Sequence, residues 1–130
     1  MKFRTEIIIP KEKFSIFHQD KIMMIGSCFV ENMAIKMLEA GFQIDLNPFG
    51  IIYNHVSISN ALYDLLYKKE YAEDDIFLYN GIYQSFSHHG YFSGIEKEKV
   101  LQEMNTRLIN SRKFLANASF LIITFGTAKI

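Results

Sequence analysis

The 130-residue sequence lacks several features that would narrow its function. It has no tryptophan, one cysteine and two prolines, and its formal net charge is zero because 14 lysines and arginines balance 14 aspartates and glutamates. A chain with balanced, scattered charges offers no basic surface to a phosphate backbone, so we expect no nucleic-acid partner. The single cysteine, Cys28, excludes an internal disulfide.

Long apolar runs are also missing. None reaches the about 18 residues that a membrane-spanning helix needs, and the longest, 118–125, is interrupted by Ser119 and Thr124. The first residues do not show the basic segment, apolar core and small-residue cleavage site of a secretory leader. We therefore expect no membrane partner and a cytoplasmic location.

Several familiar site motifs are absent as well. No G-x-G-x-x-G or P-loop pattern occurs, so nucleotide binding has no support. The residues around Ser27 do not form G-x-S-x-G, which excludes the sharp nucleophile elbow of α/β-hydrolases. Adjacent His88 and His89 do not share a face and no second ligand cluster accompanies them, so we expect no metal and no other cofactor.

What the chain does contain fits one domain, 1–130, without repeats, low-complexity tracts or linkers. Apolar periodicity and turn residues predict strand 21–25, a helix ended by Gly41, strand 42–46, a helix over 57–69, a β-hairpin around Asn80-Gly81, a helix from Ser93 and strand 120–125. This order predicts an α/β fold: a parallel sheet covered by helices on both faces, with an inserted hairpin.

Three finer predictions concern single segments. Residues 3–9, closed by Pro10, form an edge strand or an extended arm, because proline cannot donate to a sheet ladder. Ser57 caps the second helix. A lone cysteine beside a phenylalanine is more often a small core residue than a reactive thiolate, so Cys28 is expected in the core.

The candidate site lies where the strands end. Ser27 follows the first strand at the start of a helix, whose amino terminus would stabilise a developing oxyanion. A serine there is more often a helix cap, and a nucleophile also needs a base within hydrogen-bond reach. Asn47 and Gly50 follow the second strand and reach the same sheet edge if the strands are parallel. The Gly50 amide either donates to an oxyanion or simply permits a turn.

His88 and His89 follow the hairpin, with Gly90 next to them. Their loop is suited to reach over the sheet edge, where either ring would be a base for Ser27. The commoner interpretation is a pair of surface or turn histidines. We keep His89, with Asn47, as a candidate substrate-binding residue.

Four motifs stand in order along the chain: Gly26-Ser27-Cys28-Phe29, Asn47-Pro48-Phe49-Gly50-Ile51-Ile52-Tyr53-Asn54, Ser85-Phe86-Ser87-His88-His89 and Phe125-Gly126-Thr127-Ala128. Their order and spacing resemble the GSCFA-domain family, a relative of the SGNH (GDSL-like) hydrolases. The resemblance implies a three-layer, flavodoxin-like (SGNH-hydrolase-like) α/β fold. It also implies a serine esterase or acyltransferase that acts on an ester such as an O-acylated carbohydrate.

By this resemblance Ser27 is the nucleophile, and its backbone amide joins that of Gly50 in the oxyanion hole. Typical SGNH enzymes add a third donor from an asparagine, at the position where this chain has Ala128. Thr127 is the nearest hydroxyl that would substitute.

The resemblance also marks a departure at the carboxyl end. Family members continue past the last motif, and the SGNH hydrolases have their catalytic Asp/His pair in that continuation, whereas this chain has Lys129-Ile130 and stops. It implies that residues 1–130 are the amino-terminal part of a longer domain, with an incomplete fold, no general base and little or no activity. Two alternatives stay open: a non-catalytic module that binds a glycan or acyl ligand, and a truncated product that self-associates through strand 120–125.

Overall fold

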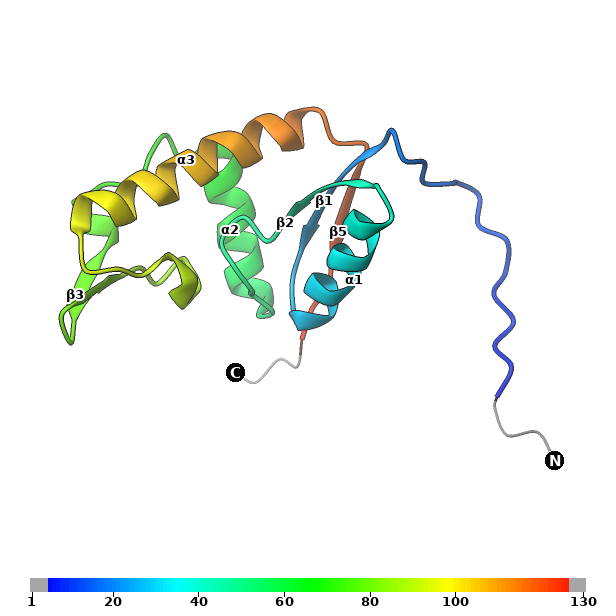
Figure 1. Ribbon diagram of the computed structural model, residues 1–130, viewed down its shortest axis with the longest axis horizontal. Coiled ribbons are helices and arrows are strands. Elements are labelled where there is room, and N and C mark those ends of the chain that lie inside the picture. The colour runs from blue at the N-terminus through cyan, green and yellow to red at the C-terminus, as the bar shows by residue number, and fades with distance from the viewer. Residues whose placement is uncertain (1–4, 127–130) are drawn as a thin grey trace.

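The computed structural model describes residues 5–126, which form a parallel sheet with helices on both faces (Figure 1). Strand β1 (Lys21–Ile25) lies in the centre, between β2 (Gln43–Leu46) and β5 (Phe120–Ile123). Both neighbours run parallel to β1. The α/β class and the three predicted core strands are therefore confirmed.

Strand β1 is apolar at successive positions because both of its faces are buried. Ile22 and Met24 face one side and pack with Val30 and Ala34 of helix α1 (Cys28–Glu39). Met23 and Ile25 face the other side. There they meet buried residues of helices α2 (His55–Tyr67) and α3 (Lys97–Ala116): Ile58, Ala61, Leu65, Val100, Met104 and Leu108.

The predicted hairpin is confirmed. Strands β3 (Phe77–Tyr79) and β4 (Ile82–Gln84) pair antiparallel. Asn80 and Gly81 have φ of 50° and 77°, the left-handed values that a type I′ turn needs.

Two helix starts differ from the prediction. Asn54, not Ser57, caps α2: its side-chain oxygen accepts from the amides of Val56 at 2.8 Å and Ser57 at 3.3 Å. Helix α3 begins at Lys97 rather than Ser93, because Gly94 is held in a β-bridge to Tyr83 of the hairpin and residues 90–92 form a short 3₁₀ turn, η2 (Gly90–Phe92). A local sequence pattern does not reveal that long-range bridge.

The prediction that Cys28 lies in the core is wrong, since its side chain is exposed. The buried face of α1 is defined by Val30 and Ala34. At about 3.6 residues per turn, position 28 lies roughly opposite position 30 and points to solvent. The neighbouring Phe29 is exposed as well, at 63%.

The amino-terminal segment is an extended arm rather than an edge strand. Over residues 5–13 it is exposed and pairs with no strand that the structure describes. Figure 1 shows it leaving the body of the domain. The chain returns to the sheet at Phe14, whose ring contacts that of Phe120 with centroids 5.7 Å apart.

Candidate functional site

Ser27 lies between the end of β1 and the first turn of α1. It occupies the N-cap position, with φ −75° and ψ 179°, yet its side chain makes no capping hydrogen bond. Its Oγ lies 3.4 Å from Oγ1 of Thr124, just beyond β5, and its backbone N–H donates to the same oxygen at 3.3 Å. The hydroxyl is therefore turned toward the carboxyl end of β5 and is not used as a helix cap.

Gly26 makes this approach sterically feasible. Its φ is 151°, and a β-carbon there would overlap both the side-chain hydroxyl and the carbonyl oxygen of Thr124. Residues other than glycine rarely adopt such a φ. The bare backbone thus allows β1 and β5 to lie close together where Ser27 begins.

Asn47 is brought to Ser27, as the parallel-strand argument predicts. Its side chain is only 7% exposed, and its Oδ1 accepts from the Gly26 backbone N–H at 2.9 Å. Its Nδ2 has no hydrogen-bond partner within residues 5–126. Because Oδ1 and Nδ2 share one carbon, an unused donor lies near the Gly26 amide, one residue before Ser27.

Gly50 closes the turn that Asn47 opens. Its φ is 79°, and its backbone N–H donates to the Asn47 carbonyl oxygen at 2.9 Å. A β-carbon at Gly50 would overlap the β-carbon of His89, and the His89 N–H donates to the Phe49 carbonyl at 2.8 Å. The amide is therefore engaged within the turn, and the loop after β2 is tied to the loop after the hairpin.

The two histidines have different surroundings. The ring of His88 is packed among Phe49, Tyr71 and Phe92, with centroids 5.1, 4.7 and 4.9 Å away, and its Nδ1 lies 3.3 Å from Ser85 Oγ. Desolvation by this burial lowers the pKa of His88 to about 4, despite the nearby carboxylate of Asp75. The imidazole is therefore neutral at pH 7.

His89 is exposed, and its Nδ1 accepts from the Tyr91 N–H at 3.4 Å. Neither His88 nor His89 hydrogen-bonds to Ser27. In the described part of the chain, Ser27 Oγ contacts no titratable side chain. The arrangement provides a nucleophile candidate and a donor, without a base in place.

We expect His88 to make stability fall with acidification. Between its unfolded pKa of 6.5 and its folded value of about 4, the unfolded chain binds a proton that the folded chain does not, so stability present above pH 6.5 is lost toward pH 4. The loss is about 2–3 kcal/mol. Urea unfolding of wild type and His88→Phe across this range checks it. The variant should show a flatter dependence, and equal slopes would assign the acid sensitivity to other groups.

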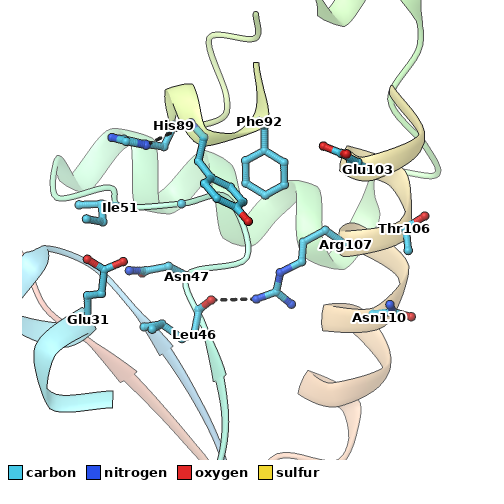
Figure 2. Close-up of a pocket in the computed structure, with 12 residues that line it drawn as sticks. Glu31, Leu46, Asn47, Ile51, His89, Phe92, Glu103, Thr106, Arg107 and Asn110 are labelled. Carbon is cyan, nitrogen blue, oxygen red and sulfur yellow. Dashed lines mark hydrogen bonds between the residues drawn. The ribbon is translucent and has the colours of Figure 1, made fainter. Parts of the chain in front are cut away.

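A cavity of about 740 Å³ opens beside Asn47, between the end of β2, η2 and α3. Figure 2 shows Glu31 and Asn47 reaching it from the sheet side, and Glu103 and Arg107 from α3. A second cavity, of about 630 Å³, shares Ile51 and His89 with the first and extends to the amino terminus of α2. Ser27 lines neither, but Glu31 lies one turn along α1 from it.

Arg107 forms one wall of the first cavity. Its guanidinium pairs with Oδ1 of Asp45 at 2.5 Å and donates to the carbonyl of Leu46 at 2.8 Å and to Ser111 Oγ at 2.5 Å. The Asp45 carboxylate is almost fully buried, and its Oδ2 has no hydrogen-bond partner in the described residues. This pair fastens α3 to the end of β2.

Sequence reasoning missed Thr124 and the Asp45–Arg107 pair. Asp45 could have been noticed, because it is a carboxylate between Ile44 and Leu46 in a predicted strand. Arg107 could not, because it lies in a polar-rich helix in which no pattern distinguishes it from the other charged residues. Thr127, the hydroxyl singled out from the resemblance, lies outside the described residues, as does Ala128.

No three His, Cys, Asp or Glu side chains between residues 5 and 126 are grouped so as to hold a metal ion. No helix in that same range combines the length and apolar character that a membrane crossing requires.

Comparison with known proteins gives one match. A sequence model described as the GSCFA family matches residues 21–130, which include every element from β1 to β5. No curated protein and no solved structure matches the chain.

Proposed function

The chain belongs to the GSCFA family, and from this premise we propose that it forms the amino-terminal part of a serine esterase or acyltransferase of the SGNH type. Its substrate is an ester, such as an O-acylated carbohydrate. The proposed architecture is the three-layer, flavodoxin-like one, supported by a parallel sheet with helices on both faces.

In the proposed reaction, Ser27 Oγ loses its proton and attacks the ester carbonyl carbon. The carbonyl oxygen becomes an oxyanion, the alcohol leaves with a proton, and the acyl group stays on Ser27. Water or a second alcohol then attacks the acyl-serine and releases Ser27. In this proposal the described residues supply the nucleophile and hydrogen-bond donors for these reaction steps.

The observation that carries the proposal is the Asn47 side chain. Its buried Oδ1 accepts from the N–H of Gly26, the residue before Ser27, and its Nδ2 is left as an unused donor. We assign this Nδ2 to the oxyanion. The Ser27 amide joins it only if its bond to Thr124 Oγ1 opens or is shared. One such donor is worth about 10²–10³ in rate.

The other predicted donors have narrower roles in this proposal. The Gly50 amide reaches an oxyanion only if its bond to the Asn47 carbonyl opens or is shared. Thr127 remains a predicted donor. His89 lines both cavities and contacts substrate from above Gly50.

We expect Ser27 to react slowly with a fluorophosphonate probe and faster when imidazole is added. A missing general base costs about 10²–10⁴ in rate, and free imidazole supplies part of that function. Peptide mass spectrometry locates the adduct and times its formation. Ser27→Ala should form no adduct at this peptide with or without imidazole.

Two results bear on this proposal. An adduct at Ser27 that accelerates with imidazole supports it. A folded chain, verified by circular dichroism, that gives no Ser27 adduct at any imidazole concentration contradicts it.

A second candidate function is ligand binding without catalysis. It is favoured by the absence of any titratable partner of Ser27 Oγ in the described residues. It predicts glycan or acyl-ligand binding that is unchanged in Ser27→Ala. Self-association through strand 120–125 also stays a proposal, supported by β5 pairing with β1 alone among the described strands.

A further inference from the structure

The first cavity contains more hydrogen-bonding groups than the fold itself uses. The side chain of Asn47 is only 7% exposed, and its Nδ2 has no hydrogen-bond partner among residues 5–126. Glu31 and Glu103 line the same cavity, and their carboxylates make no hydrogen bond or ion pair within that range. Thr106 and Asn110 of α3 add further polar atoms at its rim (Figure 2). A ligand that fills this space would therefore meet both donors and acceptors.

The charge of the cavity restricts the ligand. Arg107 is the cation among the lining residues, and its charge is already balanced by Asp45 at 2.5 Å. The carboxylates of Glu31 and Glu103 are then left without compensation. Like charges in a partly enclosed site repel, so a phosphate, sulfate or uronate ligand is disfavoured.

Tyr91 gives the cavity an aromatic surface. Its ring is 84% exposed although it lies at the cavity, and it packs edge-on against buried Phe92 with centroids 5.6 Å apart and planes at 87°. The η2 turn that carries it is fixed by the His89 cap and by the Ser93 hydroxyl, which donates to the Gly90 carbonyl. The turn that carries Tyr91 is therefore fixed, and the exposed ring presents an apolar face to a ligand.

We infer that this cavity binds an uncharged, hydroxyl-rich ligand, namely a neutral saccharide. Sugar hydroxyls donate to the Glu31 and Glu103 carboxylates. One hydroxyl accepts from Asn47 Nδ2, whose amide group has two N–H donors and so keeps one when the other serves the oxyanion. The C–H-rich face of the ring lies against Tyr91. A volume of about 740 Å³ is within the usual range for small-molecule sites.

Other ligand classes fit less well. An acyl chain would remove water from the Glu31 and Glu103 carboxylates without offering them hydrogen-bond donors, which is costly. A polyamine would satisfy the carboxylates but leave Asn47 Nδ2, a donor, facing another donor. The inference rests on the proposed function in one respect: the saccharide would be the alcohol part of the ester, because Glu31 lies one helical turn from Ser27.

The test is binding of the full chain to an array of neutral oligosaccharides, uronate-containing oligosaccharides and sugar phosphates, with spermidine measured separately by calorimetry. We expect neutral glycans to bind and the anionic ones not to bind. For a neutral glycan that binds, Tyr91→Ala should weaken affinity roughly tenfold, whereas Tyr91→Phe keeps the ring and most of the affinity. Glu103→Gln removes one of the two negative charges of the cavity, so this variant should bind the anionic glycans more tightly than wild type does.

Tyr79→Ala is the matched control, because Tyr79 is an exposed tyrosine on the hairpin that does not line the cavity. Its affinity should equal that of wild type. The inference is overturned if neutral glycans do not bind, if anionic glycans or spermidine bind instead, or if the two alanine variants lose affinity equally. Binding by Ser27→Ala separates this inference from the proposed reaction, since the cavity should keep its saccharide even if Ser27 is never acylated.

Discussion

Replacing Gly26 with alanine should unfold most of the protein or leave it barely stable. The added β-carbon would overlap the Thr124 carbonyl oxygen as well as its hydroxyl, and a backbone atom cannot rotate away. β1 would have to separate from β5, or Gly26 would have to leave its φ of 151° and lose the bond to Asn47. We expect a loss of more than about 4 kcal/mol, against a typical total of about 5–15 kcal/mol for a domain.

Urea unfolding followed by circular dichroism measures this loss. Gly81→Ala is the control, because Gly81 also has a positive φ, 77°, but no atom within 4 Å of an added β-carbon. It should cost about 1 kcal/mol from backbone strain alone. Adding Thr124→Ala to Gly26→Ala should recover only part of the loss, since the carbonyl overlap persists. Equal effects of Gly26→Ala and Gly81→Ala would show that β1 and β5 are not closely packed at Gly26.

Replacing Arg107 with methionine should be the second most damaging change. It leaves the Asp45 carboxylate buried, without its cation and with Oδ2 already unpartnered. Removing one partner of a buried ion pair costs about 3–5 kcal/mol, because the remaining charge is uncompensated. The guanidinium's bonds to Leu46 and Ser111 are lost as well.

A double variant, Asp45→Asn with Arg107→Met, tests the cause. It removes the stranded charge and should be clearly more stable than Arg107→Met alone in urea unfolding. Lys97→Ala breaks an exposed pair with Glu73 and serves as the surface control, with little expected change. If the double variant is as unstable as Arg107→Met, the damage comes from lost packing and not from the Asp45 charge.

The elements that sequence predicted well are those with local signals. The continuous apolar run 21–25, the helical spacing after Ser27 and the Asn80-Gly81 turn each depend on neighbours a few residues away. Their types were confirmed in the structure. Helix starts were less predictable because Gly94 is held by Tyr83, a partner that a short window does not include.

For the candidate site, the sequence predicted where the backbone segments lie but not how their side chains point. Parallel strands bring their carboxyl ends to one edge, which placed Asn47 against Gly26, the residue before Ser27. Side-chain directions could not be derived in that way. The unused Nδ2 of Asn47 and the neutral ring of His88 among aromatic side chains follow from packing between segments distant in sequence.

The contacts of Ser27 with Thr124 also set an order of events during protein synthesis. The two residues are 97 positions apart, so the ribosome makes nearly all of the described chain before the serine acquires its neighbour. Until β5 has emerged, the central strand has only β2 beside it. Closing so long a loop is slow compared with forming helices or hairpins. A nascent chain therefore carries this serine without its Thr124 contact until β5 has been made and has paired with β1.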